Sequence, residues 1–254
     1  FAVGPFRSVA ETHGRVRLEY WGTEFTDDEL RWAFAETRPM LDFFEERAGV
    51  PYPGRTYTQV LAAGRVEQEV GHFTLLGESY GRRLLDDPKD LWLMAHELAH
   101  QWWGNGVTCV DWMHFWLNEG MATFLAAAYR ETRFGREAYL KEIDEARLAY
   151  EGVRKKGADK ALVFADWLKP SADDRVIVYS KGAYVLHLLR ESLGDALFWE
   201  GLRSYTRRHM GGSVTTADFL KAMEESTRRD LSGFFRQWVY SPDNPHITEL
   251  PQPR

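Results

Sequence analysis

The spacing of hydrophobic and polar positions changes near residue 87, and this change divides the chain into two parts. In the first part, Arg15–Tyr20 alternates polar and apolar residues, as a half-buried strand does. Two further strands are expected over Tyr57–Leu61 and Val66–Leu76, with Gly64 between them and Gly71 inside the second. The first part is therefore expected to contain a β-sheet.

One helix is expected between the first two of these strands. Thr26 and Glu29 have the spacing of a capping box, in which each side chain satisfies a free backbone amide of the first turn. Gly49 is expected to end the helix, and Pro39 to kink it. Apolar residues between these points fall on one helical face: Leu30, Ala33, Phe34, Leu41 and Phe44.

After residue 87 no strand pattern is recognisable, and helical spacing takes over. Asp87-Pro88 is expected to open a helix that stops at Gly104, with Asp as N-cap and Pro in the first turn. A second helix is expected from about Asn118 to just before Gly135. Further helices are expected over 136–151, 179–193, 195–209, 216–229 and 231–240. The chain is thus predicted to be one α+β domain, 1–254, with a mixed α/β lobe over about 1–86 and a helical lobe over about 87–254.

The amino-acid composition argues against some classes of function. The 254 residues are 44% hydrophobic, enough for a sizeable core, and the net charge of −6 argues against a nucleic-acid partner. No run approaches the roughly 20 apolar residues of a membrane-spanning helix. The single cysteine, Cys109, permits no internal disulfide and is interpreted as a small buried side chain. The sequence does not reveal the cellular compartment.

The strongest chemical signal is the stretch from His96 to His100, which reads His-Glu-Leu-Ala-His. Residues four apart lie on one face of a helix, so both imidazoles can point at one ion. Glu97 is rotated by about 100° from His96 and lies beside that point. A catalytic zinc ion has three protein ligands and keeps a fourth position for water. Glu119, separated from His100 by eighteen intervening residues and placed at the start of the next helix, is the predicted third ligand.

These residues carry a resemblance to a known family. "HELAHQWWGN", "WLNEGMATF", "VYSKGAYVLHLLR" and "GFFRQWVYSPDNP" resemble the aminopeptidase N family of gluzincin metallopeptidases. The resemblance covers nearly the whole chain. It implies the thermolysin-like catalytic fold, with the zinc site at the junction of the two lobes.

The resemblance also implies roles for individual residues. His96, His100 and Glu119 match the ligands of one zinc ion, Glu97 matches the general base, and Tyr179 matches the tyrosine that stabilises the transition state. The implied activity is removal of N-terminal residues from peptides by Glu-assisted attack of zinc-bound water. Family members usually carry a β-rich domain before this one and often a helical domain after it, and such domains are expected as further parts of the full-length protein.

One part of the sequence departs from the family. Family aminopeptidases bind the substrate amine through the glutamate of a Gly-x-Met-Glu-Asn strand, and here the Met and Asn are absent. Alignment from Gly64 puts Glu67 at that position, whereas counting back from Glu78 puts Glu69 there. Residues two apart on a strand face the same side, so either carboxylate could point into the cleft. Both could equally be solvated carboxylates on an exposed edge strand.

This departure leaves three functional hypotheses open. The leading hypothesis is an aminopeptidase. The second is an endopeptidase-like enzyme on the same zinc scaffold, favoured by the altered strand. The third is a zinc-bearing binding domain without turnover, against which Glu97 and Tyr179 count. The preferred side chain, the physiological substrate and the oligomeric state cannot be read from the sequence.

Overall fold

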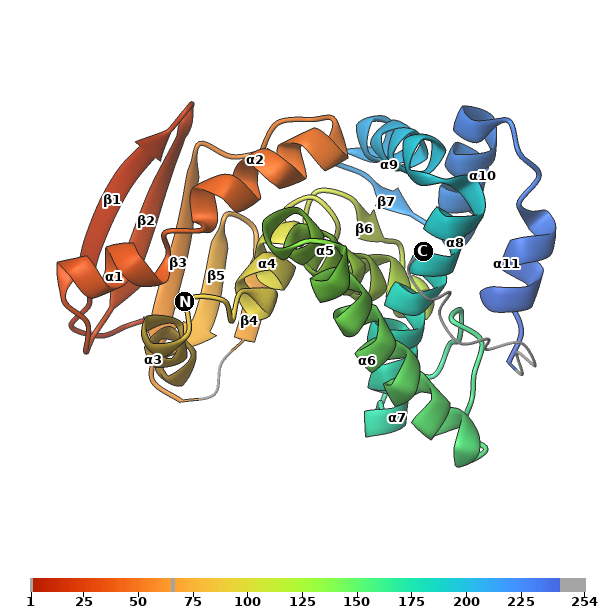
Figure 1. Cartoon of the computed structure of the whole chain (residues 1–254), viewed down its shortest axis with the longest axis horizontal. Coiled ribbons are helices and arrows are strands. Elements are labelled where there is room, and N and C mark those ends of the chain that lie inside the picture. The colour runs from red at the N-terminus through yellow and green to blue at the C-terminus, as the bar shows by residue number, and fades with distance from the viewer. Residues whose placement is uncertain (1, 65–66, 243–254) are drawn as a thin grey trace.

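The computed structural model describes residues 2–64 and 67–242, and it places a sheet at one end and most of the helices at the other (Figure 1). The sheet order is β1-β2-β3-β5-β4. The inner pairs β2/β3 and β3/β5 are parallel, whereas β1 and β4 are antiparallel edge strands. The strands are β1 Arg7–His13, β2 Val16–Gly22, β3 Thr56–Ala62, β4 Glu67–Val70 and β5 Phe73–Gly77.

The sheet has one face covered by helices and one open face. Leu18 pairs with Tyr57 across β2 and β3, and both are fully buried beneath helices. Trp21 pairs with Val60, which pairs with Leu75, and these three side chains line a shallow cavity on the opposite face. Successive side chains along the strands therefore point to opposite faces of the sheet, as the sequence pattern of Arg15–Tyr20 predicted.

The predicted strand Val66–Leu76 is wrong in one respect, because it is a hairpin. Val70 pairs with Phe73, so Gly71 and His72 form a two-residue turn between β4 and β5. His72 has a φ of +66°, a left-handed conformation that non-glycine residues adopt only at a cost. Val66, the first residue of the prediction, lies outside the described residues.

The helices confirm most of the predicted ranges. The helical elements are α1 Asp27–Ala33, α2 Thr37–Ala48, α3 Glu78–Asp86, α4 Trp92–Ala99, a 3₁₀ turn Trp112–His114, α5 Trp116–Phe134, α6 Arg136–Lys155, α7 Ala172–Val176, a π-helical turn Ile177–Lys181, α8 Gly182–Leu193, α9 Asp195–His209, α10 Thr216–Thr227 and α11 Ser232–Trp238. None of the helices within residues 2–64 and 67–242 has both the length and the apolar character that a bilayer span requires.

Four predictions about these elements need correction. The helix expected to kink at Pro39 is two helices, and the break precedes Pro39, which lies in the first turn of α2 where its missing N–H is tolerated. Helices α3 and α7 and strand β1 were not predicted. The motif helix runs from Trp92 to Ala99, so it begins later than Asp87 and ends before the predicted stop at Gly104. Two short strands, β6 Thr108–Cys109 and β7 Ser213–Val214, occur where no strand was expected.

The start of α4 is decided by a tertiary contact. The Tyr80 hydroxyl of α3 accepts a hydrogen bond from the backbone N–H of Met94 at 3.1 Å, so it satisfies a free amide of the first turn. The same hydroxyl donates to the carbonyl of Asp90 at 2.8 Å. Asp87 instead caps the short turn before the helix by accepting from the N–H of Lys89.

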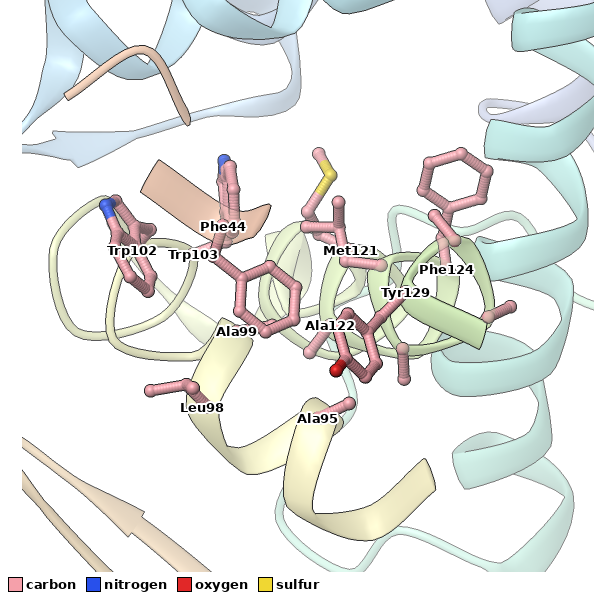
Figure 2. Close-up of a cluster of buried hydrophobic side chains, with 14 of the residues drawn as sticks. Phe44, Ala95, Leu98, Ala99, Trp102, Trp103, Met121, Ala122, Phe124 and Tyr129 are labelled. Atoms are coloured by element: carbon pink, nitrogen blue, oxygen red, sulfur yellow. The ribbon is translucent and has the colours of Figure 1, made fainter. Parts of the chain in front are cut away.

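Small side chains allow α4 and α5 to pack closely, as Figure 2 shows. Ala95 and Ala99 of α4 and Ala122 of α5 are fully buried. Larger side chains close the cluster around them, and the ring of Phe44 from α2 lies 5.9 Å from that of Trp102 in a tilted arrangement. Because interiors are packed to near-crystalline density, this cluster fixes α4 relative to α5. The two helices that carry the predicted metal ligands are therefore held together by apolar packing.

Candidate metal centre

The predicted ligands come from the ends of two packed helices. His96 lies in the last turn of α4, and His100 is its C-cap with helical backbone angles. Glu119 lies at the start of α5. All three side chains are buried, with exposures of 4%, 1% and 3% respectively. The fold therefore brings the residues of the sequence motif and the distant glutamate to one enclosed place.

Three ligand atoms converge there. His96 Nε2 and His100 Nε2 lie 3.1 Å apart, and each lies 3.3 Å from Glu119 Oε2. A tetrahedral zinc site with bonds of about 2.0–2.1 Å has ligand atoms about 3.3–3.4 Å apart. Glu119 Oε2 is buried and makes no well-aligned hydrogen bond to another described residue. The triangle therefore has the size that a tetrahedral divalent ion needs, and the donor set of two imidazoles and a carboxylate suits zinc.

The surrounding contacts orient the imidazoles for this role. His100 Nδ1 lies 3.0 Å from the carbonyl of Trp103, so this nitrogen carries the proton and Nε2 keeps its lone pair for an ion. Gly104 leaves room for this arrangement, since a Cβ there would lie 2.8 Å from His100 Nδ1 and the φ of +142° disfavours any other residue. The His96 ring is sandwiched between Trp92 at 4.9 Å and Tyr179 at 5.9 Å.

Electrostatics keep Glu119 ionised. Burial alone would raise the pKa of the Glu119 carboxyl, but His100 and His96 outweigh burial and hold this pKa well below its usual range. Burial lowers the pKa of His96, whereas Glu119 raises the pKa of His100 to about 9 against the effect of burial. A proton and a divalent cation thus compete for the same triangle of atoms.

Glu97 is placed beside the triangle, not in it. Its side chain is buried, and Oε2 has no hydrogen-bond partner among the described residues. Burial raises the pKa of Glu97 to about 8, and the carboxylates of Glu69, Glu119 and Glu67 add to this effect. A buried, unpartnered carboxylate with a pKa near neutrality has the properties of a general base.

Tyr179 lies in the π-helical turn Ile177–Lys181, just before α8. Single π-helical turns are rare and occur often at functional sites. Burial raises the pKa of the Tyr179 phenol, and the nearby Glu119 carboxylate raises it further, so the hydroxyl stays protonated and can donate a hydrogen bond. Lys181 of the same turn is fully buried and donates to Asp159 at 3.0 Å. This ion pair ties the turn to the segment after α6.

A close backbone crossing sets the distance between Glu119 and Tyr179. A Cβ on Gly120 would lie 2.9 Å from Gly182 Cα, and a Cβ on Gly182 would lie 2.9 Å from Gly120 Cα. Gly120 follows the ligand Glu119, and Gly182 begins α8 directly after the turn that carries Tyr179. Only two glycines permit this approach, which brings the tyrosine beside the metal ligands.

The two candidate amine-binding residues both lie on β4. Glu67 pairs with Leu76 and Glu69 with Thr74, and both partners are buried on the helix-covered face of the sheet. Both glutamates therefore belong to the side of β4 that faces α4. Glu67 is exposed and Glu69 is partly buried. The charge of Glu69 is among the main influences that raise the pKa values of His96, Glu97, His100 and Tyr179, whereas that of Glu67 is among the main influences only for Glu97.

A cavity of about 830 Å³ adjoins the metal centre on the side of Trp92. Thr123 of α5 and Ser180 of the π-helical turn also line it, and charged residues of the α3–α4 connection and α6 form its outer wall. A cavity of this volume has room for several residues of an extended peptide.

Sequence reasoning missed several residues that shape the site. Trp92 is four residues before His96, and this spacing on one helical face was a usable signal. The sequence carries no comparable signal for Gln101, Thr123 and Lys181, because their roles depend on contacts with other elements. Thr123 Oγ1 lies 3.5 Å from His96 Nδ1.

Comparison with known proteins agrees with this geometry. Residues 32–238 match the peptidase family M1 domain. Aminopeptidase M1 of Arabidopsis thaliana is 28% identical over 97% of this chain and 29% of its own length. Aminopeptidase N of Escherichia coli (strain K12) is 28% identical over 92% of this chain and 28% of its own length. The chain thus spans less than a third of the length of these relatives.

Solved structures show the same fold. An M1 zinc metallopeptidase mutant from Deinococcus radiodurans, bound to a Tyr-Ser-Ala substrate, superposes with a TM-score of 0.75 at 24% identity. The match covers 99% of this chain and 55% of that one. The α+β fold class predicted from the sequence, a sheet-containing lobe followed by a helical lobe, is therefore confirmed.

Proposed function

The chain belongs to peptidase family M1, and from this premise we propose that it hydrolyses peptide bonds as a zinc-dependent aminopeptidase. The observation that carries the proposal is the triangle formed by His96, His100 and Glu119, whose edges of 3.1, 3.3 and 3.3 Å fit one tetrahedral zinc ion. Bound zinc would supply a water of lowered pKa and would polarise the scissile carbonyl. Relatives and solved structures named as aminopeptidases or zinc metallopeptidases support this assignment.

The protein's own side chains divide the remaining work. Glu97 accepts a proton from the attacking water and delivers it to the leaving amine, because its pKa lies near neutrality and no group in residues 2–64 and 67–242 binds its Oε2. Tyr179 keeps its proton and donates a hydrogen bond to the oxygen on which negative charge develops. Both roles need the site to be shielded from bulk water, and the burial of the surrounding residues provides this.

We assign recognition of the substrate's α-ammonium group to Glu69. Glu69 is partly buried on the side of β4 that faces α4, whereas Glu67 is exposed, and the Glu69 charge is among the main influences on His96, His100 and both proposed catalytic groups. A free N-terminus held beside β4 would place the first peptide bond at the metal centre. The leaving part of the peptide would then extend into the cavity beside Trp92. The sheet and the helices form one catalytic unit in this proposal, since β4 comes from one lobe and the metal ligands from the other.

A second candidate function is endopeptidase cleavage on the same scaffold. The observation that favours it is that β4 is an edge strand of the described sheet. An extended peptide could add to such an edge through main-chain hydrogen bonds, without a free amino terminus. The expected additional β-rich and helical domains remain a prediction, since this chain covers less than a third of its curated relatives.

A paired assay separates the candidates. One peptide is offered with a free N-terminus and again with an acetylated N-terminus, each with and without a zinc chelator. We expect the free peptide to be cleaved much faster than its acetylated form, and the cleavage to be lost with chelator and restored by zinc. Equal cleavage of both peptides would favour the endopeptidase. A folded sample without zinc in elemental analysis, and with no turnover after zinc is added, would contradict the proposal.

A further inference from the structure

Gln101 connects the metal helix to the β4–β5 turn. It directly follows His100, and its side chain is 1% exposed. Its Oε1 accepts a hydrogen bond from the backbone N–H of His72 at 2.7 Å, and its Nε2 donates to the carbonyl of Val70 at 3.0 Å. Only one orientation of the amide satisfies both contacts, since one partner is a donor and the other an acceptor. Both polar groups of the Gln101 amide therefore bind the backbone on either side of Gly71, at the β4–β5 turn.

This turn has an unfavourable backbone conformation that its contacts stabilise. His72 has a φ of +66°, a left-handed conformation that is unfavourable for a non-glycine residue. Besides its bond to Gln101, His72 accepts a hydrogen bond from the N–H of Thr58 at 3.0 Å through its carbonyl. Its Nδ1 lies 3.0 Å from the Tyr52 hydroxyl. The contacts with Gln101, Thr58 and Tyr52 together hold the turn in one position relative to α4.

The position of Glu69 depends on this turn. Strand β4 has four residues and pairs with β5 at one edge of the described sheet. Glu69 immediately precedes Val70, whose carbonyl is bound by Gln101. Because β4 is short and has one neighbour in the described sheet, the hydrogen bond at the Val70 carbonyl is a direct link between this strand and the residue that follows His100.

We propose that Gln101 is a positioning residue, which ties the β4–β5 turn to the metal helix and thereby fixes the Glu69 carboxylate at the distance that selects a free amino terminus. The inference rests on the proposed aminopeptidase function. Displacement of a binding group by about 1 Å is enough to weaken a reaction about a hundredfold in favourable cases. Loss of the tie acts on substrate binding and leaves the metal triangle, Glu97 and Tyr179 in place.

Gln101→Met is the test variant, because Met has a similar length and cannot form either hydrogen bond. Gln59→Met is the matched control. Gln59 is also fully buried, lies on β3 of the same sheet, and accepts one hydrogen bond from Thr37 at 2.7 Å. Both variants remove a buried amide, but only Gln101→Met removes the contact with β4.

Two readouts are measured on each variant after zinc content has been found equal to that of the wild type. The first is the ratio of kcat/KM for a free peptide to that for its acetylated form. We expect Gln101→Met to lower this ratio about tenfold through KM, equivalent to about 1.4 kcal/mol, with no change in Gln59→Met. The second is hydrogen exchange, which we expect to accelerate in the β4–β5 hairpin of Gln101→Met alone.

The outcomes distinguish this inference from the proposed function. If the wild-type protein cleaves neither peptide, or cleaves both equally, the proposed aminopeptidase function is contradicted. Hydrogen exchange in the β4–β5 hairpin still tests whether Gln101 holds the turn. A wild type that prefers free peptides, with an unchanged ratio in Gln101→Met, overturns the inference alone. An equal fall in Gln59→Met also overturns it, because the effect would then come from general loosening of the sheet. Unchanged hairpin exchange in Gln101→Met would show that the tie does not hold β4.

Discussion

In the proposed function the metal triangle and strand β4 serve the same site, and they are stabilised in different ways. The triangle lies at the ends of two helices joined by a buried apolar cluster, and its His96 ring stacks on Trp92 and Tyr179. Strand β4 is short, largely exposed and paired on one side within the described sheet. The difference suggests that bond cleavage depends on rigid buried groups, whereas substrate selection depends on a weakly supported strand. Changes on the first side should act on kcat, and changes on the second on KM.

The largest effect is expected from Glu97→Gln. The amide cannot accept the water proton, so kcat should fall by about 10²–10⁴-fold, the contribution typical of general acid–base catalysis. Zinc content should stay at one ion per chain, because Glu97 lies outside the triangle. Steady-state kinetics and elemental analysis measure the two quantities. A variant that keeps its turnover would exclude Glu97 as the base.

Tyr179→Phe should have the next largest effect. The ring and its stack on His96 remain, but the hydrogen bond to the developing negative charge is lost. We expect kcat to fall by about 10²–10³-fold, as for loss of one donor to a transition-state oxygen. KM should change little. An increase in KM with constant kcat would assign Tyr179 to substrate binding and would contradict the division between buried groups that act on kcat and strand residues that act on KM.

Glu69→Gln tests the other side of the site. Loss of the carboxylate should raise KM for peptides with a free N-terminus by about 10–100-fold, or about 1.4–2.7 kcal/mol. Acetylated peptides should be unaffected. Glu67→Gln is the matched control, since Glu67 lies on the same strand and face but is more exposed. The reverse result, a larger effect in Glu67→Gln, would transfer amine recognition to Glu67.

Gly182→Ala should have the smallest effect on turnover and a measurable effect on stability. The new Cβ would lie 2.9 Å from Gly120 Cα, so the helices must separate, at a cost of about 1–3 kcal/mol. A shift of Tyr179 should lower kcat a few-fold with little change in KM. Thermal unfolding and kinetics measure both effects.

Gly152→Ala is the control for this substitution. Gly152 lies inside α6 with open space around it, so alanine should stabilise the helix by about 0.5–1 kcal/mol. Equal destabilisation by both substitutions would mean that the Gly120–Gly182 crossing has no special role.

Helix-based features were the most predictable part of this protein. The spacing of His96, His100 and Glu119 is a local property of two helices, and the structure brings their ligand atoms together. The capping box at Thr26 and the glycine stop at Gly49 are also confirmed, since each depends on hydrogen bonds within a few residues.

Predictions failed where a distant contact competed with a local signal. Asp87-Pro88 resembles a helix start, yet α4 begins at Trp92 because the Tyr80 hydroxyl satisfies its first turn. The stretch up to Leu76 reads as one strand, yet it turns at His72, whose left-handed backbone is stabilised by Gln101 and Thr58 from other elements. Neither contact leaves a trace in the local pattern of residues.

The sequence by itself determined the chemistry available to this protein: two imidazoles and two carboxylates at helical spacings that could be read directly, and a phenol that the family resemblance identified. Only the tertiary structure decided how these groups face one another. The Gly120–Gly182 crossing brings Tyr179 beside Glu119, and the hairpin register puts Glu67 and Glu69 on the face toward α4. The physical reason is the distance along the chain over which each kind of interaction acts. Helical spacing and caps act over a few residues, whereas ligand convergence and strand placement depend on packing between segments far apart in the chain.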